Sequence, residues 1–293
     1  MKVAIYGRSF EDSFSEYVQE LFDTLAKFNW GVTIFEPYAA YLNPRLNLAE
    51  NNISTYNKHH EIEINVDLMI SIGGDGTFLE TIHIVKDSGI PILGLNAGRL
   101  GFLASTQKED ISEVLMDIKV GQYRLQTRSL LKLDSNIDLF NNENFALNEL
   151  TVHKKDSSSM ITIHTYIDDL YLNSYWADGL IIATPTGSTA YSLSCGGPIL
   201  VPGARDFIIT PIAPHNLNVR PVVVPDSRKI TLKIEGRSKE FLCSMDSRSV
   251  SIDSSTNLSI TKADFRINII QTENQNFLNT IRNKMMWGLD RRN

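Results

Sequence analysis

The stretch that decides the fold of this chain is Ser71-Ile72-Gly73-Gly74-Asp75-Gly76-Thr77. The apolar-rich run 66–70 before it predicts a buried strand, and residues 78–82 after it predict a helix with Thr77 as its N-cap. A strand, a glycine turn and a helix start in this order are typical of phosphate-binding loops. Glycine lets backbone N–H groups approach an anion closely, and the positive end of the helix dipole points to the same place.

The carboxylate in this turn needs an explanation, because it repels phosphate oxygens. We expect Asp75 either to be screened by a divalent cation or to face another atom, such as a hydroxyl. The alternative for a glycine cluster of this kind is a tight turn with a solvated aspartate. A second glycine-rich strand exit, Gly94 to Phe102, follows one crossover later. It favours a ligand crevice, because ligands of open α/β sheets bind outside the carboxyl ends of the strands.

Composition and charge limit the classes of function. With 293 residues the chain is longer than a typical single domain, so we expect two domains. The net charge of −6 argues against a partner that is nucleic acid or a membrane surface, because such proteins carry a basic face. We find no bilayer-spanning apolar run and no signal-peptide pattern. The cysteines, Cys195 and Cys243, are too few for a disulfide framework, and we expect a cytoplasmic setting.

Strand and helix patterns alternate over roughly the first 120 residues. Strand patterns lie at residues 3–6, 32–35, 66–72 and 91–95. Helical patterns lie at residues 14–25, 77–87 and 111–118. Such alternation predicts a parallel α/β sheet.

From Arg124 onward the pattern changes to short segments, many of which alternate apolar with polar residues, at 129–133, 160–167, 229–234 and 258–261. Turn-forming residues separate them, which indicates an antiparallel or mixed β domain. Residues 277–287 have apolar side chains at helical spacing and are expected to pack on the first domain. We therefore expect an α/β domain of residues 1–123 and 275–293, and a β-rich domain of residues 124–274.

Polar segments of the second half suit a ligand site. Asn148-Glu149 follows an apolar run and is either the polar end of a strand or a pair that binds a ribose diol. Asp178-Gly179 precedes the apolar run 180–183. The run Thr184 to Ser194 is dense in hydroxyl groups, which favours a ligand loop. Alternatively, these hydroxyl groups satisfy the backbone of their own loop.

Taken together and in this order, the motifs resemble those of NAD kinases. They are Gly73-Gly74-Asp75-Gly76-Thr77, Asn96 to Phe102, Asn148-Glu149, Asp178-Gly179 and Thr184-Pro185-Thr186-Gly187-Ser188-Thr189-Ala190-Tyr191. Gly196 to Ile199, Pro211 to Leu217 and Arg220-Pro221 fit as well, so the resemblance spans most of the chain. Lipid kinases and phosphofructokinases carry relatives of the glycine motif, whereas the hydroxyl-rich loop is far more specific.

The resemblance implies transfer of the γ-phosphoryl group of ATP to the 2′-hydroxyl of the adenosine ribose of NAD, which makes NADP. Mg²⁺ or another divalent cation would neutralise the phosphates. The implied fold is a three-layer Rossmann-like α/β domain and a β-sandwich-like domain, with the C-terminal helix returning to the first. The β domain is expected to assemble a homodimer or homotetramer in which sites borrow residues from a neighbouring subunit.

The resemblance also assigns residues to roles. Asp75 contacts the acceptor hydroxyl, within a nucleotide-binding turn of Gly73, Gly74, Gly76 and Thr77. The dinucleotide is held by Asn148 and Glu149, with Asp178 and Ala190 near the nicotinamide and Thr189, Tyr191 and Ser194 on the adenine side. We name no metal ligand. Many members carry a basic residue where this chain has Trp176, which offers a stacking face instead of a phosphate contact.

Phosphoryl transfer to a ribose hydroxyl does not require Asp75 to be a strong base. A carboxylate is too weak a base to deprotonate a ribose hydroxyl in advance. Phosphoryl transfer passes through a loose transition state, so orientation of the acceptor matters more than its deprotonation. We therefore expect Asp75 to align the hydroxyl and to accept its proton late.

Three other classes of protein match parts of the pattern. A lipid kinase shares the glycine turn, but the acidic composition and the polar 184–194 loop argue against it. A non-catalytic dinucleotide-binding module would lack the acceptor-side carboxylate, which is present. A NAD-dependent dehydrogenase predicts Gly-x-Gly-x-x-Gly after the first strand, where this chain has Gly7-Arg8-Ser9-Phe10-Glu11-Asp12.

Overall fold

The computed structural model describes residues 1–48, 53–57, 66–98, 101–155, 159–273 and 276–287. The chain forms two compact units, Met1–Thr127 with Ile267–Asn293, and Arg128–Arg266. We call them the α/β unit and the β unit. The divisions fall inside two long strands, β6 (Arg124–Ser135) and β17 (Leu258–Gln271), a few residues from the expected domain boundaries. Because each strand continues from one unit into the other, no loop marks the boundary.

The sheet of the α/β unit is parallel, as its alternating pattern predicts. Its strands are β1 (Lys2–Gly7), β2 (Gly31–Phe35), β3 (Ile53–Tyr56), β4 (Leu68–Gly73) and β5 (Ile92–Asn96). They lie in the order β5-β4-β1-β2-β3, and the end of β17 pairs with β5 through Ile269 and Ile92. The chain order therefore reverses between β1 and β4, which is the topological switch point of a doubly wound sheet.

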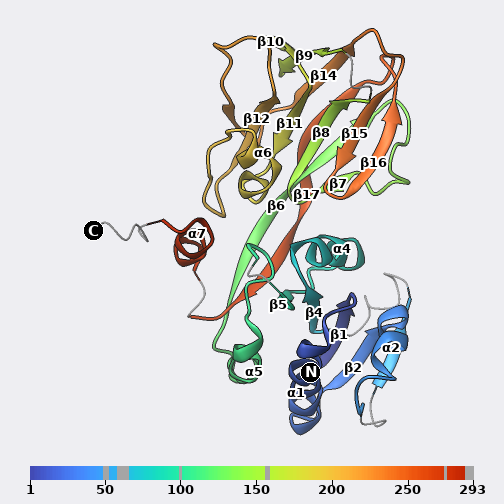
Figure 1. Ribbon diagram of the computed structural model, residues 1–293, viewed down its shortest axis with the longest axis vertical. Helices are drawn as coiled ribbons and strands as arrows, with labels where there is room; N and C mark the ends of the chain where they lie inside the picture. The colour runs from blue at the N-terminus through green and yellow to red at the C-terminus, as the bar shows by residue number, and fades with distance from the viewer. Residues whose placement is uncertain (49–52, 58–65, 99–100, 156–158, 274–275, 288–293) are drawn as a thin grey trace. The chain divides into compact units, whose positions relative to one another are not determined.

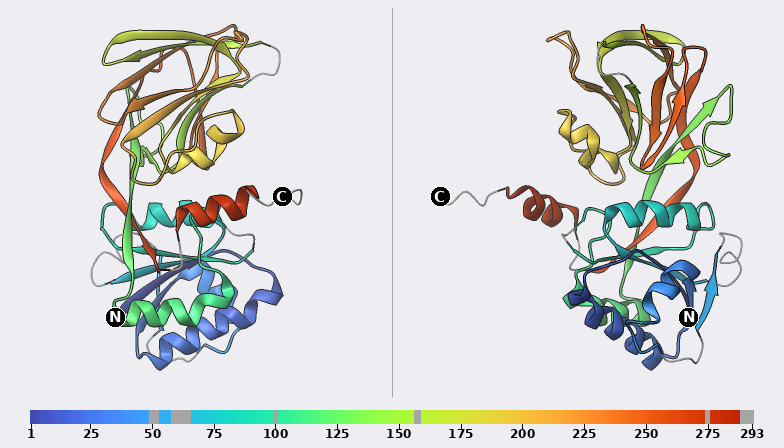
Figure 2. Two further views of the ribbon diagram at one scale, coloured as in Figure 1. Left: turned by 90° about the vertical axis from the view of Figure 1, so that its left-hand side faces the viewer. Right: turned by 45° about the vertical axis from the view of Figure 1, so that its right-hand side comes forward.

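Helices cover both faces of this sheet, which makes three layers. They are η1 (Asp12–Phe14), α1 (Ser15–Lys27), α2 (Glu36–Leu42), α4 (Asp75–Val85), η2 (Lys108–Asp110) and α5 (Ile111–Val120). Figure 2 shows α4 on one face and α1 with α5 on the other. Alternate residues of β4 serve the two faces: Ile70 joins the core under α1 and α5, whereas the Ser71 hydroxyl accepts a hydrogen bond from Thr81 of α4 at 2.8 Å.

Two local predictions for this unit need correction. Helix α4 begins at Asp75 and its N-cap is Gly74, so Thr77 lies in the first turn and is not the cap. Strand β3 and helix α2 are not among the predicted elements. Both are short, and α2 has Pro37 near its start, so neither shows the long periodicity that identifies an element in sequence.

The β unit consists of two sheets around one core (Figure 1). The first contains β10 (Leu170–Ala177), β9 (Ile161–Ile167), β14 (Ile230–Glu235) and β17, with β6 and β7 (Phe145–Ala146). The second contains β13 (Val222–Pro225), β12 (Asp206–Ile212), β11 (Gly179–Ala183), β8 (Glu149–Lys154), β15 (Phe241–Met245) and β16 (Arg248–Ile252). Pairing within the second sheet is antiparallel, which confirms the predicted β-sandwich-like domain.

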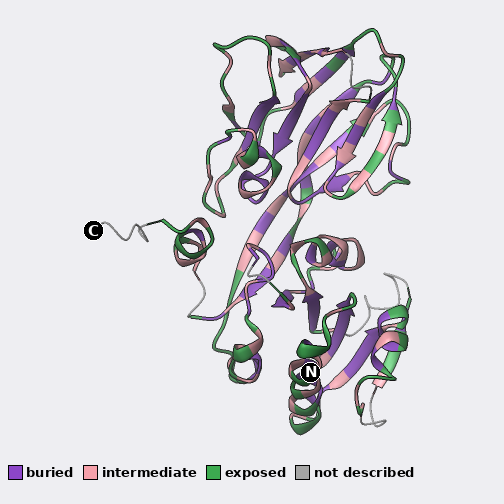
Figure 3. Cartoon of the chain, viewed as in Figure 1, coloured by how far each residue is buried: buried purple, intermediate pink, exposed green. Residues whose placement is uncertain are grey.

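Burial follows the alternation that the sequence predicts. Residues of the inner strands are buried in both units, as Figure 3 shows. In β9, for example, Ile161 and Ile163 face the core and the residues between them do not. Two short helical turns, η3 (Gly187–Thr189) and α6 (Tyr191–Ser194), follow β11.

The C-terminal helix α7 (Phe277–Met285) returns to the α/β unit, as expected. Its Phe277 ring lies 6.5 Å from that of Phe102, and the Lys284 ammonium lies over the same Phe102 ring at 4.6 Å. Asn276 caps it by accepting a hydrogen bond from the Asn279 N–H at 2.8 Å. Within the described residues, no helix combines the length and the apolar character needed to cross a membrane.

Candidate active site

A pocket of about 460 Å³ lies at the switch point of the α/β sheet. Its lining comes from the segments that follow β1, β4 and β5, at their carboxyl ends: Arg8, Ser9, Phe10, Glu11, Gly73, Gly74, Thr77, Asn96, Ala97 and Gly98. This is the position at which doubly wound sheets bind their ligands. The structure thus brings the two predicted glycine-rich strand exits together at one pocket; Arg99 and Leu100 of the second exit lie outside the described residues.

The glycines of the turn differ in what the fold requires of them. A Cβ at Gly73 would collide with the Thr77 side chain, so packing alone explains that glycine. A Cβ at Gly74 or Gly76 would meet nothing within 4 Å, and both residues are exposed. Gly76 lies inside α4, where glycine costs about 1 kcal/mol relative to alanine. These two positions leave the backbone amides at the start of α4 open to an approaching anion.

The loop after β5 donates hydrogen bonds to the Asp75 side chain, a contact that the sequence did not predict. Its Oδ2 atom accepts a hydrogen bond from the Phe102 N–H at 2.9 Å, and its Oδ1 atom accepts from Leu103 and Ala104, both at 3.0 Å. A Cβ at Gly101 would collide with this carboxylate. Asp75 therefore has a structural task besides any chemical one, and the loop amides fix the direction of its carboxylate.

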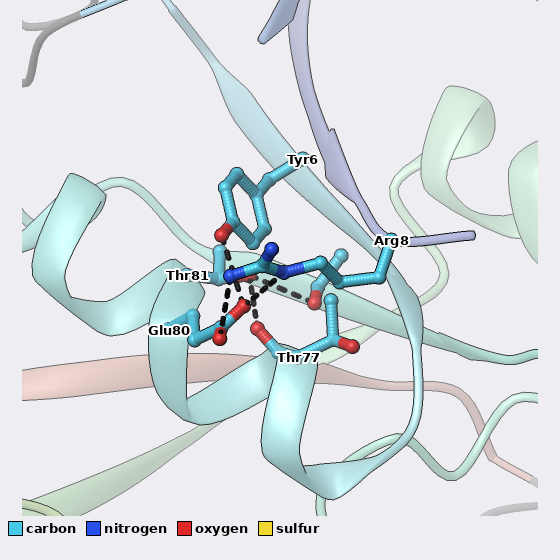
Figure 4. A network of polar contacts seen from close by, with 6 residues as sticks. Tyr6, Arg8, Thr77, Glu80 and Thr81 are labelled. Atoms are coloured by element: carbon cyan, nitrogen blue, oxygen red, sulfur yellow. Dashed lines mark hydrogen bonds and ion pairs between the residues drawn. The ribbon is translucent and has the colours of Figure 1, made fainter. Parts of the chain in front are cut away.

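A cationic side chain that sequence reasoning missed lies beside the pocket. Arg8 donates to both oxygens of Glu80, from Nε and Nη2 at 2.8 Å each, and Tyr6 donates to Glu80 at 2.9 Å (Figure 4). Burial raises the pKa of Glu80, but the Arg8 and Tyr6 hydrogen bonds outweigh it and hold that pKa below its ordinary value. The only sequence signal for Arg8 was a cation directly after the first strand.

In the β unit, Glu149 of the Asn148-Glu149 pair has an unusual environment. The Tyr191 backbone N–H donates to its carboxylate, while its Oε2 atom is buried and has no partner among the described residues. Burial, together with the nearby Asp246 carboxylate, raises the pKa of Glu149 to about 8. A carboxyl group with one oxygen unsatisfied is available to a ligand hydroxyl.

Several hydroxyl groups of the 184–194 loop already have partners within the protein, which supports the alternative interpretation for that part of the stretch. Ser188 donates to the Pro185 carbonyl at 2.6 Å, and Thr189 donates to the Thr186 carbonyl at 3.2 Å. The Ser192 hydroxyl pairs with that of Thr210 at 2.8 Å. A Cβ at Gly187 would collide with the Asn148 backbone, so the loop packs directly on the Asn148-Glu149 turn.

The remaining predicted residues of the β unit follow β10 or lie in the 184–194 loop. Asp178 forms an ion pair with Lys154 at 2.5 Å. Burial raises the pKa of the Tyr191 phenol, as do the neighbouring Cys195 thiol and the Asp178 and Glu149 carboxylates. Ala190 and Thr189 are half-buried, and Ser194 is exposed at the end of α6. Tyr191 therefore lies within electrostatic reach of both Glu149 and Asp178.

Trp176 stands at the rim of a second pocket, on β10. Its ring centroid lies 4.3 Å from that of His215, and the His215 N–H donates to the Trp176 carbonyl at 2.9 Å. The pocket, of about 550 Å³, also takes in Leu217 and Val219. The indole is half exposed and available for stacking.

The described residues contain no group of three or more His, Cys, Asp or Glu side chains placed to hold a metal ion. Mg²⁺ commonly keeps several waters and is bound through substrate phosphates rather than through an all-protein cage.

Two family models match the chain. The ATP-NAD kinase N-terminal domain matches residues 3–123, and the ATP-NAD kinase C-terminal domain matches residues 147–272. Relatives named NAD kinase match it over their full length and its own: those of Flavobacterium psychrophilum at 49% identity, Cytophaga hutchinsonii at 48% and Bacteroides fragilis at 44%.

Solved structures agree on the fold. A yeast NADH kinase in complex with NADH superposes with a TM-score of 0.86 at 23% identity, covering 98% of this chain and 88% of that one. An NAD kinase from Archaeoglobus fulgidus in complex with ATP has a TM-score of 0.73 at 25% identity, covering 96% of this chain and 99% of that one. With both family models matched and relatives aligned from end to end, the chain belongs to the NAD kinase family.

Proposed function

We propose that this chain transfers the γ-phosphoryl group of ATP to the 2′-hydroxyl of the adenosine ribose of NAD. The observation that carries the proposal is the open glycine turn. Gly74 and Gly76 have no packing reason to be glycine, and they leave amides of a helix N-terminus exposed at a pocket on the switch point. NAD and ATP are accordingly the substrates.

The α/β unit supplies the triphosphate site in this proposal. Gly73, Gly74, Gly76 and Thr77 surround the phosphates, which interact with the backbone N–H groups at the start of α4. Arg8 adds a guanidinium group, which pairs with phosphate oxygens in a planar fork. Glu80 holds that group at the pocket in the absence of ligand.

Asp75 aligns the acceptor hydroxyl. A carboxylate offers about four lone-pair positions. Two on Oδ1 and one on Oδ2 already accept backbone N–H groups, which leaves Oδ2 one position for a substrate hydroxyl. The amides fix the orientation of the carboxylate before substrate binds. Such preorganisation favours catalysis here, because a loose transition state depends mainly on the positioning of the reacting groups.

The β unit supplies the dinucleotide-binding residues. Asn148 and Glu149 bind a ribose diol, and the unsatisfied Oε2 atom of Glu149 supports this role. Asp178 and Ala190 contact the nicotinamide end, and Thr189, Tyr191 and Ser194 contact the adenine side. The hydroxyl of Thr189 donates to its own loop, so it meets the ligand as an acceptor.

Three further assignments complete the proposal. Mg²⁺, or another divalent cation, enters bound to the ATP phosphates. The protein forms a homodimer or homotetramer with shared sites, since Leu170, Tyr171, Trp176 and Leu217 expose large apolar side chains on the β unit. It works in the cytoplasm, which agrees with two cysteines that are both free thiols.

The experiment that tests the function identifies the phosphorylated product. The protein is incubated with ATP labelled in its γ-phosphate, Mg²⁺, NAD and, in a parallel reaction, vesicles containing diacylglycerol. We expect the label in a dinucleotide whose new phosphate monoester ³¹P NMR assigns to the adenosine 2′ position. Label in lipid would instead indicate a lipid kinase, and no transfer to either acceptor would indicate a non-catalytic module.

A further inference from the structure

Asp246, in the turn between β15 and β16, forms hydrogen bonds with the backbone of the Asn148-Glu149 turn. Its Oδ2 atom accepts a hydrogen bond from the Leu147 N–H at 2.8 Å, and its Oδ1 atom accepts from the N–H groups of Asn148 at 2.8 Å and Glu149 at 3.2 Å. Its own N–H donates to the Glu149 carbonyl at 3.1 Å. One residue, almost a hundred positions away in sequence, thus makes four hydrogen bonds to three consecutive residues.

The hydroxyl-rich loop completes this arrangement from the other side. The Thr184 hydroxyl donates to the Leu147 carbonyl at 2.5 Å, and the Thr184 N–H donates to the Asn148 carbonyl at 2.8 Å. Every backbone donor and acceptor of residues 147–149 therefore has a partner. A turn held in this way has little freedom, and its side chains are presented in a fixed direction.

The side chain of Arg248 supports the same segment at its start. The guanidinium group donates to the carbonyls of Glu143 and Phe145, both at 2.6 Å. Its positive charge also lies close enough to Asp246 to favour the ionised carboxylate. The Asp246 side chain thus has three N–H donors and a nearby positive charge that favour its ionised form.

Asp246 and Glu149 are like charges, and their surroundings differ. Burial raises the pKa of Asp246, but three N–H donors and Arg248 oppose that rise. Glu149 has one N–H donor, from Tyr191, and no cation is among the groups that perturb it. The Tyr191 phenol is also near Glu149, and Asp178, which is near that phenol, pairs with Lys154. The nearby Asp246 carboxylate therefore disfavours ionisation of Glu149 and adds to the effect of burial.

We propose that Asp246 is a positioning residue for the acceptor substrate: it holds the 147–149 turn so that Asn148 and Glu149 meet the ribose. This inference rests on the proposed function, in which those two side chains bind NAD. Asp246 would play this role through hydrogen bonds to the backbone of residues 147–149.

Asp246→Asn tests the proposal with little change in shape. An amide has one acceptor oxygen, so at least one of the three N–H groups loses its partner. We expect the KM for NAD to rise about tenfold or more while the KM for ATP stays within about twofold. Asp253→Asn is the matched control, because Asp253 also accepts hydrogen bonds within a turn of the β unit, but from the backbone N–H and hydroxyl of Ser255 and not from residues 147–149.

A pH series separates positioning from general loss of structure. NAD binds the Glu149 carboxylate in our proposal, so its affinity falls as pH drops through the pKa of that group. Removing the charge of Asp246 lowers that pKa, and the fall in affinity moves to lower pH in the variant. A structural defect alone lowers the active fraction, and hence kcat, without moving this profile. A folded Asp246→Asn protein with the parental KM for NAD and the parental pH profile contradicts the inference.

The parent protein provides a test that does not depend on how the variant folds. Hydrogen exchange of the 147–149 amides without ligand is expected to be as slow as in β8, because all three donate to a buried carboxylate. Rapid exchange of these amides contradicts the inference. Calorimetry of NAD binding to the parent separates the two proposals: absence of binding overturns the proposed function, whereas normal binding with an unaltered Asp246→Asn variant overturns only the role of Asp246.

Discussion

At the scale of single residues, the surroundings of each carboxyl group decide its role. Asp75 and Asp246 each accept three backbone N–H groups, so both are fixed in direction and hold a loop or a turn. Glu149 accepts one N–H and keeps a buried oxygen without a partner. Glu149 therefore lowers the stability of the fold, as ligand-binding residues commonly do.

Glu149→Gln is expected to stabilise the fold and weaken NAD binding. The folded-state pKa of Glu149 is raised from 4.5 to about 8, so between these values the folded protein holds a proton that the unfolded chain releases. The stability of the parent then falls as pH rises through this window. In thermal unfolding, we expect the variant to match the parent near the lower end of the window. Near the upper end it should be more stable by on the order of 1 kcal/mol, or roughly 2–4 °C. A difference in melting temperature that does not change with pH argues against this account.

Arg8→Met is expected to weaken ATP binding. It removes the guanidinium group at the pocket and leaves the Glu80 charge to repel phosphate. We expect the KM for ATP to rise about tenfold with the KM for NAD unchanged. Arg228→Met is a suitable control, because Arg228 likewise forms an ion pair with a carboxylate, that of Asp168, but lies in the β unit. Equal KM values for ATP in parent and variant would remove Arg8 from the site.

At the scale of elements, the glycine turn and α4 together form the anion-binding feature of the proposed site. The turn leaves amides open, and the helix directs its positive end at them. Helix α4 has to begin at Asp75 for these amides to be unpaired, and Gly74 as N-cap allows that start. A phosphate site then results from backbone geometry, with Arg8 adding charge.

Gly76→Ala separates helix stability from ligand binding. No atom lies within 4 Å of the added Cβ, so alanine should stabilise α4 by roughly 0.5–1 kcal/mol. The same methyl group obstructs approach to the amides, and we expect the KM for ATP to rise. Gly31→Ala makes the same change in β2, where the Cβ meets only Lys2 at an ordinary 3.7 Å, and should leave the KM for ATP unaltered. A variant that gains stability and keeps full ATP affinity argues against phosphate binding at this turn.

Local patterns predicted the elements that carry the site, and long-range contacts explain what they missed. The strand, turn and helix around Asp75 are encoded in one continuous segment, from Leu68 to Val85, so the parallel sheet and its glycine turn were predictable. The partners of Asp75 lie near residue 103, and Asp246 is far from Asn148 in sequence, so neither contact has a local signal. The full lengths of β6 and β17 were also missed, because strand length depends on pairing as much as on composition.

At the scale of the whole molecule, the proposed function assigns the two substrates to different units. ATP belongs to the α/β unit and the dinucleotide-binding residues to the β unit. Strands β6 and β17 each contribute residues to both units.

Assembly into an oligomer is expected to use the apolar residues exposed on the β unit. Leu217 is 86% exposed and lines the pocket of Trp176, and β10 lies at the end of its sheet. We expect light scattering on a sizing column to give a multiple of the 33.0 kDa chain mass, and Leu217→Asp to reduce it. A parent protein of 33.0 kDa at working concentration rules out the proposed assembly.

The central claim is that Asp75 orients the NAD hydroxyl for phosphoryl transfer, and the rate of NADP formation tests it most directly. Parent and Asp75→Asn proteins are compared at saturating NAD, ATP and Mg²⁺, with NADP read by a strictly NADP-dependent dehydrogenase and NAD binding measured alongside. We predict that the parent forms NADP, and that the variant binds NAD comparably but turns over about two to four orders of magnitude more slowly. A folded parent that forms no NADP, or a variant as fast as the parent, would contradict the account.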